Sequence, residues 1–183
     1  MQNQNQNQNQ GHNQNEDHGR GSAVPAGPAP FSMRIEGVVI PIADHDRARA
    51  FYTALGWRVD ADVDDGRGYR LAQFTPPGSN ASVLFGTAVT GQRPGSADGL
   101  LLVVDDVVAA RAALRDRGAD VSEVFHAADG VLGGGFHPGS IGRALGTDPE
   151  RRSYASYASF EDPDGNRWIL QEVTDRLPGR TWE

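Results

Sequence analysis

Three side chains in the second half of the chain have types that suit acid–base or metal chemistry: His126, His137 and Glu161. Imidazole binds divalent metals and titrates near neutral pH, and a carboxylate can exchange a proton with a substrate. One hypothesis is therefore a non-standard metal site or a His/Glu acid–base pair. The other is that both histidines are hydrogen-bonded to loop backbone, because no third ligand lies at a diagnostic spacing. His45 follows an aspartate at a predicted helix start, and we expect it to be exposed.

Composition excludes several other kinds of chemistry. The chain has no Cys, and all 17 basic residues are Arg. Thiolate nucleophiles, thiolate metal sites, disulfides, Schiff bases and a phosphate-loop lysine are therefore excluded. There is no Gly-x-Ser-x-Gly elbow, and the glycines of 133–135 lack the spacing of a dinucleotide fingerprint. A net charge of −7 argues against a nucleic-acid partner.

The elements that must position these residues come from an internal repeat. The stretch that begins at Gly37 recurs at Gly99 without a gap, displaced by 62 positions. A unit that is written twice predicts two similar modules, and missing it would change the whole expected architecture. We place module one at 33–90 and module two at 97–175.

Each module reads as a strand, a helix, a second strand and a hairpin. An aspartate is placed to cap each helix start, and a glycine to end each helix in the left-handed conformation. The expected segments are strands 38–42 and 100–104, caps Asp44 and Asp106, helix ends Gly56 and Gly118, strands 57–63 and 119–125, and hairpins 69–85 and 154–173. In the second hairpin, Asp162-Pro-Asp-Gly165 is typical of a type I turn.

Two motifs, together with the repeat, resemble the vicinal oxygen chelate superfamily, which includes glyoxalase I, bleomycin-resistance proteins, fosfomycin-resistance enzymes and extradiol dioxygenases. The motifs are Ile42-Ala-Asp-His-Asp-Arg-Ala-Arg-Ala-Phe-Tyr-Thr-Ala-Leu-Gly56 and Phe160-Glu-Asp-Pro-Asp-Gly-Asn-Arg-Trp-Ile-Leu-Gln-Glu172. The resemblance covers roughly residues 33–175. It implies an α+β fold in which two βαβββ modules form a curled mixed sheet around a cup. It specifies the scaffold rather than the chemistry.

The resemblance also implies where a metal would bind. Enzymes of the superfamily usually hold a divalent metal with His or Glu on the first and last strands of each module. Carried over by position, these ligands fall at Gly37, Gly99 and Ile169, with the fourth near Ser82, Val83 or Leu84. None of these is a usual ligand, and strand parity puts Glu172 on the face opposite to Ile169. We therefore expect no metal cofactor, with a divalent metal at an atypical site as the alternative.

Strand parity further predicts what lines the cup. Alternate residues of a strand share a face, so the cup receives an apolar surface with a few polar groups, as small-molecule sites require. The predicted ligand-contacting residues are Val39, Leu101, Val103, His126, His137, Arg167, Ile169 and Gln171, with Pro41 on the same face. Trp168 lies on the opposite face, where we expect it to pack beneath a helix.

Module two carries an insertion. The final hairpins of the modules align at an offset of 86 rather than 62, so about two dozen extra residues lie within 126–153. Loops of this length are usually functional or disordered. The glycines of this segment would permit the close backbone approach and the movement of a lid over the cup. Arg151 and Arg152 would either clamp an anionic ligand or belong to a solvated turn.

These features favour a metal-free small-molecule-binding protein, similar to the bleomycin-resistance proteins, that captures an organic ligand in an enclosed cup. The main alternative is a lyase, isomerase or dioxygenase that uses an atypical metal or the candidates His126, His137 and Glu161. A protein-interaction module is a third, weaker hypothesis. Members of the superfamily often pair modules across a dimer, so the resemblance implies a homodimer. The identity of the ligand stays open.

The ends of the chain lie outside the predicted domain, which spans 33–175. Residues 1–32 read as a disordered Gln/Asn-rich tail followed by an Ala/Pro/Gly linker, and 176–183 as a C-terminal tail. The first segment has neither a cationic start nor an apolar run, so we expect no secretory signal and no membrane partner. A cytoplasmic location is the default expectation.

Overall fold

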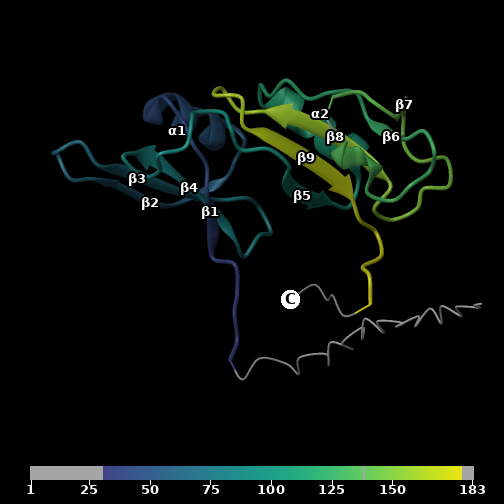
Figure 1. Cartoon of the computed structure of the whole chain (residues 1–183), viewed down its shortest axis with the longest axis horizontal. Coiled ribbons are helices and arrows are strands. Elements are labelled where there is room, and N and C mark those ends of the chain that lie inside the picture. The colour runs from purple at the N-terminus through teal and green to yellow at the C-terminus, as the bar shows by residue number, and fades with distance from the viewer. Residues whose placement is uncertain (1–30, 138, 179–183) are drawn as a thin grey trace, which may run out of the picture. The chain divides into compact units, whose positions relative to one another are not determined.

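The computed structural model describes residues 31–137 and 139–178. The chain divides into two compact units, Met1–Arg34 and Ile35–Glu183. The described helices and strands all lie in the second unit (Figure 1). Most of the predicted tail and linker at 1–32, and positions 179–183 of the predicted C-terminal tail, lie outside the described residues. In the described part of the chain, no helix has the length and apolar character that crossing a membrane requires.

The second unit is an α+β structure with two sheets and a helix in each module, which confirms the predicted fold class. Sheet 1 has the strand order β1 (Gly37–Val39), β4 (Ser82–Thr87), β3 (Arg70–Thr75), β2 (Arg58–Asp64). Sheet 2 has the order β5 (Leu100–Val104), β9 (Arg167–Glu172), β8 (Ser156–Glu161), β6 (Phe125–Ala127), β7 (Arg143–Leu145). The helices are α1 (His45–Ala54), α2 (Val107–Asp116) and the short 3₁₀ helix η1 (Gly134–Phe136). In each sheet the first strand of the module pairs in parallel with its last strand.

The two long helices begin and end where the sequence predicts. The carboxylates of Asp44 and Asp106 accept hydrogen bonds from backbone N–H groups in the first turn of α1 and α2. These bonds satisfy donors that have no partner within the helix. Gly56 and Gly118 follow the helices with φ of +82° and +91°, a region that glycine adopts without steric cost.

The second strand predicted for module two, 119–125, is not continuous, and this prediction is wrong. Val121 forms only an isolated bridge to Phe160. The Ser159 backbone N–H then donates to the Ser122 hydroxyl at 3.0 Å. A side-chain oxygen thus accepts the hydrogen bond that a backbone carbonyl would accept in a regular ladder. Regular pairing resumes only in β6.

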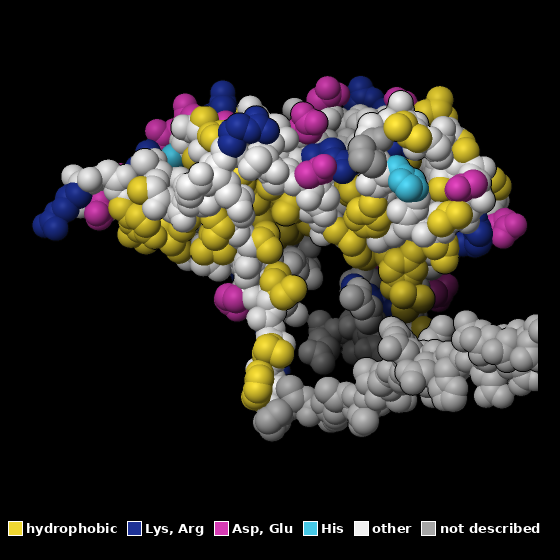
Figure 2. Space-filling model, viewed as in Figure 1, with side chains coloured by type: hydrophobic (Ala, Val, Ile, Leu, Met, Phe, Trp, Pro, Cys, Tyr) yellow, Lys and Arg dark blue, Asp and Glu magenta, His cyan; other side chains and the backbone are white. Residues whose placement is uncertain are grey.

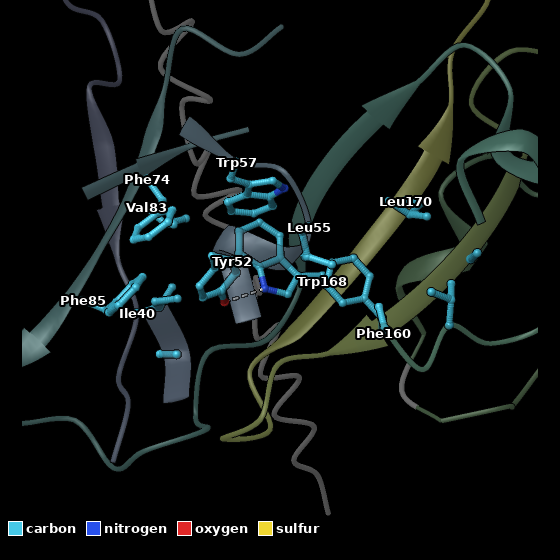
Figure 3. Close-up of a cluster of buried hydrophobic side chains, with 14 of the residues drawn as sticks. Ile40, Tyr52, Leu55, Trp57, Phe74, Val83, Phe85, Phe160, Trp168 and Leu170 are labelled. Atoms are coloured by element: carbon cyan, nitrogen blue, oxygen red, sulfur yellow. Dashed lines mark hydrogen bonds between the residues drawn. The ribbon is translucent and has the colours of Figure 1, made fainter. Parts of the chain in front are cut away.

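The main hydrophobic core joins both modules around helix α1 (Figure 3). Tyr52 is fully buried, and its hydroxyl donates to Asp162 Oδ2 at 2.9 Å and accepts from Trp168 Nε1 at 3.2 Å. Burial, and secondly the Asp162 carboxylate, raise the pKa of Tyr52. The rings of Trp57 and Trp168 meet edge to face with centroids 5.1 Å apart. Trp168 therefore packs in the core beside α1, which confirms the expectation for this residue.

The turn between β8 and β9 also ties the two modules together. The Gly165 backbone N–H donates to the Asp162 carbonyl oxygen at 2.9 Å, as in a type I turn. Asn166 Nδ2 reaches the Pro41 carbonyl oxygen of module one at 2.9 Å. A Cβ atom at Gly95 would lie only 1.9 Å from the backbone oxygen of Asp164, so glycine is required for this close approach.

His45 is buried, which corrects the expectation that it is exposed. Only 4% of this residue is accessible. Its ring centroid lies 5.9 Å from that of Phe85, and its Nε2 lies 3.8 Å from Asp62 Oδ1. Because the first turn of α1 rests on sheet 1, this position faces the sheet rather than solvent.

Candidate functional site

Each sheet has one face that packs against its long helix, α1 or α2, and an opposite face that neither long helix covers, which we call the cup face. Trp168 of β9 packs into the core on the helix side, so its neighbour Ile169 points to the cup face. The register places Leu101 beside Ile169, and Val103 beside Gln171. Leu101 is 43% exposed, whereas Ile169 is fully buried. The structure thus brings these four predicted contact residues together on sheet 2.

Val39 lies on the cup face of the other sheet. It is 45% exposed and pairs with Leu84. A polar row runs beside it: Gln73 Nε2 donates to Ser82 Oγ at 3.0 Å, and Ser82 Oγ lies 2.7 Å from Thr75 Oγ1. In Figure 2, apolar side chains gather along the edge of the sheets away from α1 and α2. The sequence did not indicate the polar row, because the hairpin register was not known.

Part of the insertion lies directly on the cup face of sheet 2. A Cβ atom at Gly135 would lie 2.4 Å from Cγ of the Tyr157 ring, so the backbone of η1 touches this ring. The Phe136 ring meets Tyr157 edge to face at 6.2 Å. Beneath them, Phe125, Tyr157 and Ile169 form a small buried cluster. The close backbone approach expected of these glycines is present, and movement of the insertion stays a prediction.

The polar groups predicted for the cup have partners within the protein. Gln171 is 4% exposed, and its Nε2 donates to the Tyr154 carbonyl oxygen at 3.0 Å and to Tyr157 Oη at 3.3 Å. Gln171 of β9 is therefore hydrogen-bonded to Tyr157 of β8 and to the segment that precedes β8, beside the buried cluster. Arg167 lies on the same face, pairs through Nε with the Asp98 carboxylate, and lines a cleft of about 270 Å³.

The structure does not bring the acid–base candidates to one place. His126 pairs with Ser156 on the helix side of sheet 2, and its Nδ1 lies 3.0 Å from the Gly146 carbonyl oxygen. Glu161 ends β8 on the cup face and is exposed. His137 is exposed and follows η1. His126 and Glu161 therefore lie on opposite faces of the sheet and cannot act as a pair in this arrangement.

The residues at the positions implied for a metal do not fit one. Leu84 is the module-one counterpart of Ile169, because each pairs with the equivalent position of its first strand. Leu84 Cδ1 lies 2.5 Å from where a Cβ at Gly37 would be, so an apolar side chain fills the space of the first-strand ligand. Within residues 31–137 and 139–178, no three His, Cys, Asp or Glu side chains are grouped to hold a metal ion.

Arg151 and Arg152 each pair with a carboxylate. Arg151 Nη2 lies 3.0 Å from Glu172 Oε2, which also accepts from the Val107 backbone N–H at the start of α2. Glu172 thus lies on the helix side, opposite to Ile169, as strand parity predicts. Arg152 donates to both oxygens of Asp148, and these bonds hold the pKa of Asp148 well below its usual value. The two arginines therefore belong to internal ion pairs.

Comparison with known families agrees with this geometry. A family model described as Glyoxalase/Bleomycin resistance protein/Dioxygenase superfamily matches residues 34–170, which include the first motif, all but the last two residues of the second, and most of both modules. The chain belongs to this superfamily. The resemblance drawn from the motifs is thereby confirmed.

Solved structures of superfamily members share the fold. TnmS3, an antibiotic binding protein from Streptomyces sp. CB03234, is 27% identical, with a TM-score of 0.55 over 78% of this chain and 97% of that chain. A glyoxalase/bleomycin resistance protein from the same organism is 28% identical, with a TM-score of 0.53 over 76% and 100% of the two chains. A superfamily member from Sphaerobacter thermophilus DSM 20745 is 23% identical, with a TM-score of 0.55 over 77% and 98%. No curated protein matches the chain.

Proposed function

We propose that this superfamily member binds a small organic molecule at the cup face of sheet 2 without using a metal, in the manner of the bleomycin-resistance proteins. The observation that carries the proposal is the filling of the metal positions by apolar side chains. Leu84 occupies the space beside Gly37, and the fully buried Ile169 lies at the last-strand position where a metal-binding side chain would be needed. Apolar area with a few polar groups suits capture of an organic molecule.

The similar proteins support the same reading. TnmS3, at 27% identity, is described as an antibiotic binding protein, and the second Streptomyces structure as a glyoxalase/bleomycin resistance protein. Both are matched over nearly their whole length. We therefore propose an organic molecule of antibiotic type as the ligand class.

The test uses the neutral dye N-phenyl-1-naphthylamine, whose fluorescence rises in apolar sites, followed by its displacement with bleomycin and a panel of aromatic antibiotics. The full chain is compared before and after treatment with EDTA, and its metal content is measured by mass spectrometry. We expect dye and antibiotic affinities to be unchanged by the chelator. We also expect the antibiotic that displaces the dye to be recovered chemically intact.

A pair of variants locates the binding site. Leu101→Gln removes an exposed apolar side chain from the cup face, and should weaken dye binding about five-fold, as a loss of roughly 1 kcal/mol of apolar contact implies. Val108→Gln is the control, because Val108 is 50% exposed on α2, away from the cup face. Stoichiometric metal that is needed for binding, or conversion of the antibiotic, would reject the proposal in favour of an enzyme.

We further propose that two copies of the chain associate through their cup faces. Val39 and Val63 of sheet 1 leave 45% and 48% of their surface exposed on a face without a helix. The second module presents a related face, so sheet 1 of one copy can cover sheet 2 of another, as a repeated unit allows. Exposed apolar faces of this kind favour association.

Sedimentation equilibrium tests the association. We expect the mass of two chains for the wild type. Val63→Lys should shift the equilibrium toward one chain, because it places a charge on the apolar face, whereas Val108→Lys on α2 should not. A wild-type mass of one chain across the concentration range would rule the dimer out.

A further inference from the structure

Arg143 is a half-buried cation on the cup side of sheet 2, and it has no acidic partner in the part of the chain that the structure describes. The register places it on the same face as Phe125, and its Cζ lies 4.0 Å from the centroid of that ring. Its Nη2 donates to the His137 carbonyl oxygen at 3.4 Å. Among residues 31–137 and 139–178 it forms no ion pair with any Asp or Glu. Its charge is therefore not neutralised within the described chain.

Arg167, a second arginine on this face, resembles Arg143 in having a buried nitrogen without a hydrogen-bond partner among the described residues. Arg143 Nε and Arg167 Nη1 are both buried and have no hydrogen-bond partner within the described residues. Burial lowers the pKa of Arg143, and the charge of Arg167 lowers it further, so the two cations are close enough to repel each other. Buried donors without acceptors and neighbouring like charges cost free energy, and an anion bound to these guanidinium groups would reduce both costs.

Other arginines of module two show that the fold can pair such groups. Arg151 and Arg152 have carboxylate partners in Glu172 and Asp148. Arg167 itself has only Asp98, whose side chain is 63% exposed. Arg143 differs from these three, because within residues 31–137 and 139–178 it forms no ion pair with an Asp or Glu.

There is room for a ligand group at this end of the face. Arg167 lines a cleft of about 270 Å³ together with Asp120, Ser122, Ser159, Phe160 and Glu161, and the Asp120 side chain is exposed. The two serine hydroxyls donate within the protein, Ser122 to the Glu123 carbonyl oxygen and Ser159 to Ser122 Oγ, so the cations are the groups that can bind a ligand anion. Glu161 is exposed at the end of β8, where solvent and salt screen its charge. The acidic group of a ligand is therefore better placed toward Arg143 than toward the exposed rim.

From these observations we infer that the cup of sheet 2 selects organic ligands in which an acidic group, such as a carboxylate, sulfonate or phenolate, is attached to an apolar aromatic body. Arg143 binds the acidic group, and Arg167 supplies a second positive charge. The guanidinium fork matches such groups with paired hydrogen bonds. The aromatic body lies against Leu101 and its neighbours. This inference rests on the proposed function and adds the chemical class of the ligand.

The test compares two dyes that share one skeleton. 8-Anilinonaphthalene-1-sulfonate carries a sulfonate, and N-phenyl-1-naphthylamine is the same molecule without it. Arg143→Gln should weaken sulfonate-dye binding about ten-fold while leaving the neutral dye within about two-fold, and Arg167→Gln should have a smaller effect in the same direction. Arg143→Lys keeps the charge and should lose only part of the affinity. Arg115→Gln, an exposed arginine of α2, should change neither dye.

The outcomes separate the two proposals. If the folded wild type binds neither dye, the proposed function fails and the inference fails with it. If the neutral dye binds and the sulfonate adds no affinity, only the inference fails. Equal weakening of both dyes by Arg143→Gln would assign Arg143 a structural role and overturn the inference. Circular dichroism checks that each variant is folded.

The salt dependence of dye binding to the wild type tests the same inference without any variant. Added sodium chloride should weaken binding of the sulfonate dye and leave the neutral dye unchanged, because only the former depends on charge. The same salt dependence for both dyes, or none for either, would overturn the inference.

Discussion

The two modules share a topology and differ on their cup faces. In module one, β2 pairs with β3 from Arg58 to Asp64 with a single bulge between Val59 and Ala61, and Val39 and Val63 remain exposed on the cup face. In module two, the corresponding strand is interrupted, and the insertion covers Tyr157 and Ile169. The cup face of module one is therefore open, whereas the cup face of module two is partly covered by the insertion.

This difference shows which part of the repeated unit is constrained. On the helix side, both modules contribute to a common core, and Tyr52 and Trp168 connect them through a hydrogen bond. The cup faces do not form this common core, so module two can carry there an insertion and Arg143, which has no carboxylate partner among the described residues. Folding depends on what the modules share, and the ligand selection that we propose depends on where they differ.

The largest effect is expected at the shared core. Tyr52→Ala should lower the free energy of unfolding by about 3–5 kcal/mol, because it empties a fully buried aromatic site. Tyr52→Phe should cost only about 1–2 kcal/mol, since it removes the hydroxyl alone and leaves Asp162 and Trp168 without that partner. Urea unfolding measures both. A Tyr52→Ala loss below about 1 kcal/mol, or two separate unfolding transitions, would show that the modules do not share one core.

An intermediate effect is expected where the insertion meets the cup face. Gly135→Ala should lower the free energy of unfolding by about 1–3 kcal/mol, because its Cβ would overlap the Tyr157 ring. It should also speed hydrogen exchange in η1. The matched control is Gly91→Ala, since a Cβ at Gly91 has no neighbour within 4 Å. Equal behaviour of the two variants would mean that the insertion does not rest on the sheet.

The smallest effect concerns the Asp148–Arg152 pair and appears only in acid. Arg152 holds the pKa of Asp148 below its usual value, so the pair stabilises the fold above about pH 4 and is lost as the pH falls below that. The effect is modest because Arg152 is partly exposed. Asp148→Asn should therefore be less stable than the wild type at pH 7, with the difference shrinking at pH 3.

Urea unfolding at the two pH values tests this prediction, with Asp116→Asn at the exposed end of α2 as the control. A wild type that keeps the same advantage over Asp148→Asn at pH 3 would contradict it.

Local signals predicted much of the fold. The capping aspartates, the terminating glycines and the turn at Asp162–Gly165 act through neighbouring backbone groups, so their roles can be read from sequence. Strand parity correctly separated Trp168 from Ile169. The interruption after Val121 was missed because the Ser122 hydroxyl competes with strand pairing, and only the position of Ser159 reveals this.

The candidate site was less predictable. His126 was predicted to contact ligand, but its register with Ser156 puts it on the helix side. His45 was expected to be exposed because its immediate neighbours are polar, yet it packs on Phe85, which lies far along the chain. Arg143 gave no signal beyond its position in the insertion, since the absence of a carboxylate partner depends on distant residues.

The sequence by itself determined the superfamily, the two-module plan, the helix limits and the residue types at the positions implied for a metal, because these depend on residue identity and short-range spacing. Tertiary structure decided which groups face the cup, that Leu84 fills the space beside Gly37, and that the buried Nε of Arg143 has no hydrogen-bond partner among the described residues. These outcomes arise from register between strands and from contacts between distant segments, and local sequence does not specify either.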